Sequence, residues 1–385
     1  MLLTACGART HVGADEQPLT TSCGGDAPTC ILASAAPCGA PEAVAATCDD
    51  ATSSWSCPSG ARAYVRVEPT TTCLPFRDGP LRALGGSLVR VATRDRCLWI
   101  AETVETTAGA SLRNVAFATD PAAPLGACPT RAIFATGSPE APESIVAFEE
   151  GEGPSLQVQI TGGRRFGGTT RVTYRLFRED PGAPFGVTEL GTGIGRFDEV
   201  SRKIVVSRRP RFGVDLELGD ASLVFGEHLY LWGCPPPIDF LTERCVVARL
   251  DASNALELFA GEGKWVASAR GRDGAPVFTA GPWISAVTRA GGAFTHVYTV
   301  GFGSDLQTHA ASAPEGPWRD GPNLGRCELP AEDEHAFCAG PVVHDDLADP
   351  TRNELVVSYG VGTTAKEGAR ARPEAYWTRL ARLRR

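Results

Sequence analysis

The segment Gly219–Leu250, GDASLVFGEHLYLWGCPPPIDFLTERCVVARL, decides the fold of this chain. It predicts a strand, a tight turn at Gly226-Glu227, a second strand, a loop bounded by Cys234 and Cys245, and a third strand. A short antiparallel sheet of this kind cannot bury both of its faces alone. The segment therefore predicts further sheets packed on either side.

The same plan recurs along the chain. GPWISAVTRAGGAFTHVYTV begins at Gly281 and GPVVHDDLADPTRNELVVSYG at Gly340, each with a Gly, a short apolar run, a turn and a second strand. GGSLVRVATRDRCLWIAETV, from Gly85, repeats it with Asp95 in the turn. Repeats of several strands at a spacing of about 60 to 70 residues are typical of propeller blades.

A fifth copy is weaker. SLQVQITGGRRFGGTTRVTYRLF, from Ser155, predicts two strands around a turn at Gly162-Gly163. The C-terminal AYWTRLARLRR alternates as an outer strand would, and we expect it to close the ring with Ala61–Val67. The sequence therefore predicts an all-β, five-bladed β-propeller.

Composition limits the possible functions. The net charge of −8 comes from interspersed acidic residues, and no basic tract is long enough to follow a phosphate backbone. We therefore expect no nucleic-acid partner. No run of 18 apolar residues occurs, which excludes a helical membrane span. With 43 Gly, 29 Pro and a single Met, the chain fits a turn-rich, strand-rich protein, which we expect to be a monomer.

The cysteines indicate an oxidising compartment. Thirteen are present, and setting Cys6 aside leaves an even number suited to disulfides. Cys234 with Cys245 and Cys327 with Cys338 are predicted pairs, because each brackets a short loop between blade elements. The other eight are not assignable from sequence. No CxxC spacing occurs, so we expect no bound metal and no cofactor.

The N-terminus resembles the lipobox of bacterial lipoproteins. In MLLTAC, Leu3, Thr4 and Ala5 precede Cys6, which the resemblance makes the lipidated residue, with Gly7 favouring the outer membrane or cell surface. The predicted domains are then a signal remnant at 1–6, a cysteine-rich tether at 7–60 and the propeller at 61–385. A separate cysteine-rich domain covering the first 130 residues is the alternative.

Three motifs carry a resemblance to a known clan. SAPEGPW at Ser312, LYLWGC at Leu229 and the segment from Gly340 resemble five-bladed, glycosidase-type propellers, the clan of arabinanases and xylosidases, and in particular its bacterial lipoprotein branch. The resemblance covers about Ala61 to Arg385. It implies a general base, a general acid and a further carboxylate that tunes the acid.

Candidate site residues follow from blade geometry. The innermost strand of each blade begins at one mouth of the channel, where Asp220 stands, and Glu334 lies just before the last blade. The resemblance then implies Asp220 and Glu334 as the catalytic carboxylates, with Asp215 or Asp345 as a third. Trp283 and His335 are the predicted ligand-binding residues.

Each of these residues also has a structural interpretation. Asp220 follows a Gly and could bond turn amides, Glu334 lies in a charged run inside a disulfide loop, and Trp283 could pack between blades. The Asp expected near Gly85 is missing. Two function classes therefore stay open. One is a propeller that binds an extracellular glycan or surface partner. The other is a glycoside hydrolase acting on a furanose-rich polymer such as arabinan.

Overall fold

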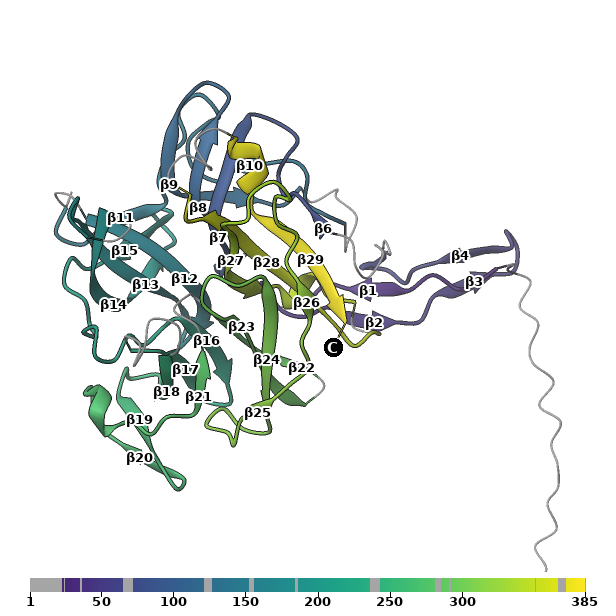
Figure 1. Cartoon of the computed structure of the whole chain (residues 1–385). Helices are drawn as coiled ribbons and strands as arrows, with labels where there is room; N and C mark the ends of the chain where they lie inside the picture. The colour runs from purple at the N-terminus through teal and green to yellow at the C-terminus, as the bar shows by residue number, and fades with distance from the viewer. Residues whose placement is uncertain are drawn as a thin grey trace, which may run out of the picture.

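The computed structural model shows a chain built almost entirely of β-strands (Figure 1). It describes residues 23, 25–34, 37–64, 72–120, 127–151, 156–183, 186–235, 243–280, 285–290, 292–349, 351–365 and 372–384. The helical content of these residues is three short 3₁₀ turns, η2(Gly271–Asp273), η3(Asp345–Leu347) and η4(Pro373–Tyr376). The all-β prediction is therefore confirmed.

Most strands belong to consecutive antiparallel meanders. The first contains β7(Leu81–Ala92), β8(Cys97–Thr106), β9(Ser111–Ala118) and β10(Ile133–Phe134). The second contains β12(Leu156–Phe166), β13(Thr169–Glu179), β14(Val187–Asp198) and β15(Lys203–Val206), with β11(Val146–Phe148) parallel to β15 at its edge. One parallel pair, Gly163 with Val91, joins the two meanders into a nine-stranded curved sheet.

Three further sheets follow. The third contains β16(Ala221–Phe225), β17(His228–Gly233), β18(Glu243–Leu250), β19(Leu256–Gly261) and β20(Lys264–Val266), with β21(Phe278–Ala280) against β18. The fourth contains β22(Ala286–Ala290), β23(Ala293–Thr299), β24(Asp305–Ala311), β25(Arg319–Asp320) and β26(Gly325–Arg326). The fifth contains β27(Ala336–Val343), β28(Glu354–Thr363), β29(Arg379–Arg384) and β6(Thr72–Cys73).

The first strands of these sheets contact one another in a closed cycle. β7 touches β12, β12 touches β16, β16 touches β22, β22 touches β27, and β27 returns to β7. Apolar clusters lie between successive sheets, for example Val91 with Val172 between the first and second, and Val297 with Val357 between the fourth and fifth. Each sheet is therefore buried against a neighbour on both faces, as the sequence repeat requires.

The strand starts follow the repeat, but one turn was placed wrongly. The turn at Gly226-Glu227 is confirmed, because Phe225 pairs with His228. The turn expected at Gly162-Gly163 is wrong: β12 continues to Phe166, and the chain reverses at Gly167-Gly168, both at positive φ. A Cβ at Gly163 would lie 2.7 Å from Val91. Gly163 therefore permits the close approach of β12 to β7, and neither Gly162 nor Gly163 forms the hairpin turn.

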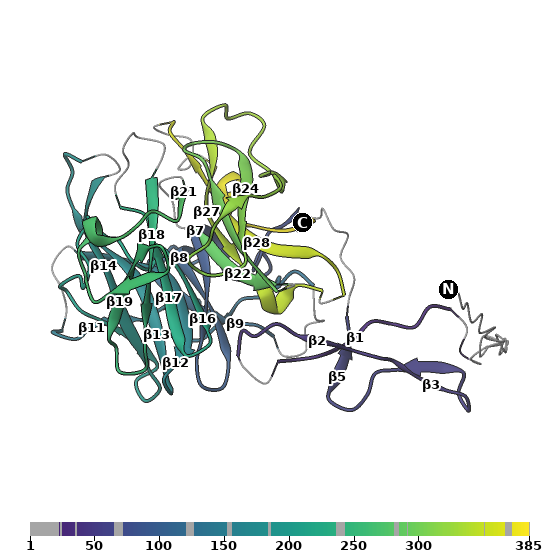
Figure 2. The same cartoon turned by 90° about the horizontal axis from the view of Figure 1, so that it is seen from below.

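Ring closure also differs from expectation. β29 pairs with Thr72–Cys73, whereas Ala61–Ala63, the start of the segment expected to do so, forms β5 and pairs with β1(Cys30–Leu32). Strands β1 to β5 form an arm that projects from the main body, with β2(Glu42–Val44), β3(Thr47–Asp49) and β4(Ser54–Ser56) (Figures 1 and 2). The alternating pattern of ARAYVRV is compatible with pairing to β29 or to β1, and only the long-range fold selects between these two strands.

Six disulfides join the twelve cysteines of the described residues. Cys234–Cys245 and Cys327–Cys338 are paired as predicted. Two disulfides, Cys23–Cys48 and Cys30–Cys57, lie within the arm. Two more, which the sequence did not assign, are Cys38–Cys97, from the arm segment to β8, and Cys73–Cys128, from β6 to the segment after β9.

Candidate functional site

Asp220 is buried at the start of the third sheet, directly before β16. Its side chain is 2% exposed, and its Oδ1 lies 3.0 Å from Nε of Arg175. Its Oδ2 accepts a hydrogen bond from the Cys234 amide at 3.4 Å. Asp220 is therefore an ion-paired carboxylate in the protein interior and not a solvated turn residue.

Arg175 collects three carboxylates. It lies in the middle of β13, and its guanidinium reaches Glu189 at 3.3 Å and Glu217 at 3.1 Å as well as Asp220. We call these four residues the Arg175 cluster. One cation facing three carboxylates in a dry environment cannot neutralise them all, so burial favours keeping a proton within the cluster.

Glu189, on β14, is the member that carries this effect most clearly. Burial raises its pKa to about 7, opposed by Arg175 and reinforced by the Asp220 charge. Burial also raises the pKa of Asp220. The Glu189 side chain keeps 20% of its surface exposed, and its buried Oε1 accepts no hydrogen bond from the described residues. Glu189 is thus a carboxyl group that is partly protonated at neutral pH and reachable from solvent.

The backbone before β16 holds the cluster in place. Glu217 has a positive φ of 42°, unusual for a residue with a side chain, and Gly219 donates its amide to the Trp232 carbonyl at 2.9 Å. A Cβ at Gly233 would lie 2.3 Å from the Glu217 carbonyl oxygen. The glycine in LYLWGC therefore lets β17 approach the turn that presents Glu217 and Asp220.

A further carboxylate, Glu102 on β8, is hydrogen-bonded to the strand that pairs with Arg175's own strand. Its Oε2 accepts hydrogen bonds from the Ser87 amide at 3.0 Å, the Ser87 hydroxyl at 3.1 Å and the Gln159 side-chain amide at 2.8 Å. Gln159 pairs directly with Arg175 across β12 and β13. Directly opposed residues share one face of a sheet, so Gln159 links Glu102 to the Arg175 cluster.

The remaining predicted residues lie elsewhere or outside the described part. Glu334 is 89% exposed and pairs with His335, itself 57% exposed, at 3.8 Å in the loop before β27. Within the described residues neither Glu334 nor His335 contacts Asp220, so the predicted pairing of Asp220 with Glu334 is not seen. Trp283 and Cys6 lie outside the described residues.

Sequence reasoning missed Arg175, Glu189 and Glu102. Arg175 interrupts the apolar run of VTYRLF, and a charged residue in a strand that is otherwise buried is a signal of a buried partner. Glu189 and Glu102 gave no such signal, because charged residues alternate normally in half-exposed strands.

Two searches of the described residues were negative. They contain no group of three or more His, Cys, Asp or Glu side chains arranged to hold a metal ion. Nor do they include a helix long and apolar enough to span a membrane.

Comparison with known proteins gives a structural likeness only. No family model matches the sequence, and no curated protein matches it either. A Bacteroides ovatus protein described as a candidate hydrolase superposes with a TM-score of 0.59 at 14% identity, covering 80% of this chain and 87% of that one. This likeness shows a shared fold.

Other structural neighbours are named glycoside hydrolases. A family 43 enzyme of Xanthomonas citri covers 82% of this chain and 90% of its own, at 11% identity and a TM-score of 0.46. An endo-arabinase of Bacteroides thetaiotaomicron covers 82% and 97%, at 12% identity and a TM-score of 0.42.

Proposed function

We propose that this protein is a five-bladed β-propeller that acts outside the cytoplasm as a glycoside hydrolase on a polysaccharide. The closed cycle of first strands supports the five blades, since each sheet packs between two others. Six disulfides support an oxidising compartment. The structural likeness supports the fold. The class of substrate follows from the motif resemblance.

The raised pKa and partial exposure of Glu189 are the observation that supports the hydrolase proposal. A general acid must hold a proton near neutral pH, and a carboxyl group with a pKa of about 7 and an accessible edge meets that requirement. Asp220, which is buried and contacts the same Arg175 Nε as Glu189, is the charge that modulates it. Glu189 therefore replaces Glu334 as the proposed acid.

Glu102 is the proposed partner carboxylate. Three hydrogen bonds orient one of its oxygens, and Gln159 holds it next to the strand that carries Arg175. A carboxylate fixed in this way can act as a general base toward water, or as a nucleophile that bonds to the anomeric carbon as the glycosidic oxygen leaves with the proton of the acid. The proposed substrate is a furanose-rich polymer such as arabinan, as the motif resemblance implies.

One observation favours a second candidate function, a propeller that binds a glycan without cleaving it. Asp220, at the start of an innermost strand, is held by Arg175 and the Cys234 amide and is sealed from solvent. A carboxylate in that position cannot touch a sugar without moving.

A sugar-release assay separates the two. Purified oxidised protein is incubated with arabinans and xylans, alongside Glu189→Gln and Glu102→Gln. The hydrolase proposal expects release by the wild type and a loss of about 100-fold or more in either variant. Glu334→Gln is the matched control, because this exposed carboxylate should be dispensable. Binding of a polymer without release by the wild type would establish the second candidate.

The lipid anchor is proposed separately from the chemistry. Cys6 is the proposed acylated residue, which would place the protein at the outer membrane or cell surface. Incorporation of labelled palmitate in a bacterial host, lost in Cys6→Ser, is the expected result, and labelling that persists in the variant would exclude Cys6.

A further inference from the structure

A cavity lies at the carboxyl ends of the innermost strands. Its volume is about 1200 Å³, and its lining includes Ala92, Arg165, Phe225 and Arg289, at or beside the carboxyl ends of β7, β12, β16 and β22, with residues of 345–349 and 351–354, between β27 and the start of β28. Asp220 and the Arg175 cluster stand at the start of β16 instead. The chain therefore presents a separate recess, distinct from the proposed catalytic carboxylates.

The recess carries an excess of positive charge. Five arginines line it, namely Arg94, Arg164, Arg165, Arg289 and Arg352, together with the acids Asp345, Asp349 and Glu354. Arg352 pairs with Asp349 at 3.6 Å, and Glu354 pairs with Arg382 at 2.8 Å, so two of the three acids are compensated. Asp345 accepts a hydrogen bond from Thr288 at 2.6 Å.

The other four arginines lack such compensation. Among the ion pairs of the described residues, none joins Arg94, Arg164, Arg165 or Arg289 to a carboxylate. Arg90, which does not line the recess, is buried and pairs with Asp346. Four arginines that make no ion pair among the described residues thus share the recess with Asp345.

Two of these guanidinium groups are already positioned. Arg289 lies over the Phe225 ring at 4.9 Å and near the Phe294 ring at 5.8 Å, and Arg164 donates through Nε to the Ser222 carbonyl at 3.3 Å. Planar guanidinium groups held in this manner match carboxylates in bidentate geometry. The partly buried Phe225 thus holds the Arg289 guanidinium at the recess.

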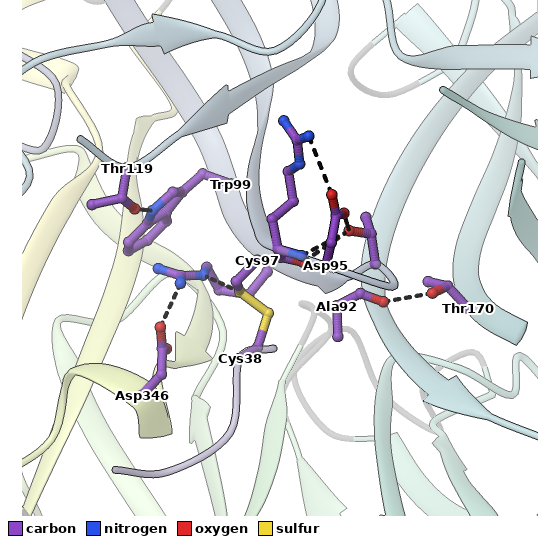
Figure 3. Close-up of a disulfide and its surroundings, with 11 residues drawn as sticks. Cys38, Ala92, Asp95, Cys97, Trp99, Thr119, Thr170 and Asp346 are labelled. Carbon is purple, nitrogen blue, oxygen red and sulfur yellow. Dashed lines mark hydrogen bonds and ion pairs between the residues drawn. A yellow bond between two sulfur atoms is a disulfide. The ribbon is translucent and has the colours of Figure 1, made fainter. Parts of the chain in front are cut away.

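A disulfide supports one wall of the recess. The arm segment from Pro37 to Pro41 lines the cavity, and Cys38 within it is bonded to Cys97 at the start of β8 (Figure 3). Arg90 donates through Nε to the Cys97 sulfur at 2.9 Å and stacks 3.9 Å from the Trp99 ring. The arm is therefore fixed where it can touch a bound ligand.

We infer that this recess binds an anionic glycan segment through its carboxylate groups, with Arg164, Arg165 and Arg289 as the anion ligands. The inference rests on the proposed function only in taking a polysaccharide as the partner. It adds that the polysaccharide carries negative charge and contacts the protein at a second region.

Calorimetric titration with a galacturonic acid tetramer, and with a neutral galactose tetramer of the same length, tests the inference. The acidic tetramer should bind at least about 10-fold more tightly, with an affinity that falls as salt rises. Arg165→Glu and the double variant Arg165→Ala/Arg289→Ala should weaken it by roughly 10-fold to 100-fold. Arg326→Ala, an 82% exposed arginine outside the recess, is the matched control.

Several results would overturn the inference. Equal affinity for the two tetramers removes the anion requirement, and unchanged affinity in Arg165→Glu places the site elsewhere. A sulfated tetramer that binds more tightly than the acidic one excludes carboxylate as the recognised group. Arg165 is exposed, so its variants should fold, and thermal unfolding checks this. Because binding is read without hydrolysis, the result stands whether or not the protein cleaves any polymer.

Discussion

At the scale of single residues, Glu189 ties the proposed chemistry to the stability of the protein. Its pKa is about 7 in the folded chain and 4.5 in the absence of the fold, so the folded state holds the proton over that interval. Stability contributed by this proton is present below about pH 4.5 and is lost as the pH rises through 7.

Glu189→Gln should remove that loss. We expect the variant to gain stability relative to the wild type as the pH rises from 5 to 8, with an upper bound of about 3 kcal/mol, because the neutral amide avoids a buried charge. Urea unfolding at several pH values measures the difference. Parallel curves for the two proteins across this range would mean that Glu189 titrates normally.

Gly233 makes a second residue-scale prediction. Gly233→Ala should destabilise the protein by about 2 kcal/mol or more, since the new Cβ would meet the Glu217 carbonyl at 2.3 Å. The control is Gly182→Ala, whose Cβ would find the Asp180 carboxylate at an ordinary 3.5 Å. Chemical denaturation compares the two variants. Equal midpoints would show that the turn at Glu217 shifts to accept the new Cβ without loss of stability.

At the scale of elements, the fourth sheet contains a buried histidine pair. His296 on β23 and His309 on β24 are register partners with parallel rings, and Phe278 stacks on His296 at 4.1 Å. Burial holds the pKa of His296 well below its usual value, and His309 lowers it further. Stability is therefore complete above the unfolded-state value of 6.5 and falls as the pH drops below it.

His296→Phe should reduce this acid sensitivity. Between about pH 6.5 and pH 5 the free energy of unfolding of the wild type should fall by about 2 kcal/mol because of His296. The variant should not show this fall, because phenylalanine gains no proton in the unfolded chain. Urea unfolding at both pH values measures how steeply the free energy of unfolding changes with pH. The exposed His335→Gln is the control, and a variant slope as steep as that of the wild type would contradict the prediction.

The arm is the other element with a testable role. Cys38→Ser/Cys97→Ser opens a loop with a sequence separation of 59, worth about 4 kcal/mol in the chain-entropy model. We expect the Pro37–Pro41 wall to detach and the affinity for the acidic tetramer to fall several-fold. Calorimetry and limited proteolysis of the arm measure both effects. If the arm became cleavable while the affinity for the tetramer stayed the same, the Pro37–Pro41 segment would make no contact with the ligand.

At the scale of the whole molecule, the ring is closed by strands from opposite ends of the chain. β6 pairs with β29 through Cys73–Leu380 and Thr72–Ala381, so the last sheet needs residues separated by about 300 positions. Each sheet shares its core with both neighbours, and loss of one contact should propagate around the cycle.

Removing β29 should therefore unfold the protein as a unit. A chain ending at Thr378 loses the buried Leu380, Ala381 and Arg382, and we expect a loss of about 5 kcal/mol or more, enough to abolish folding. A chain ending at Leu383 keeps them and serves as the control. Thermal unfolding followed by circular dichroism tests this. A cooperative unfolding transition in the chain that ends at Thr378 would show that the sheets fold independently.

The sequence by itself determined what depends on local pattern. Two-residue periodicity, turn glycines and the repeat of about 60 residues predict the strands and their order, and the short loops bracketed by Cys234–Cys245 and Cys327–Cys338 predict two disulfides. These signals are local because pleat geometry and loop closure act over a few residues.

Tertiary structure decided everything that depends on distant residues meeting. The choice of β6 over β5 as the closing strand, the four other disulfides and the Arg175 cluster all join positions far apart in the chain. Glu189 looks like any alternating charge in sequence, and its raised pKa exists only because the fold buries it against Arg175 and Asp220. The electrostatics of a site arise from desolvation and proximity, which no single segment contains.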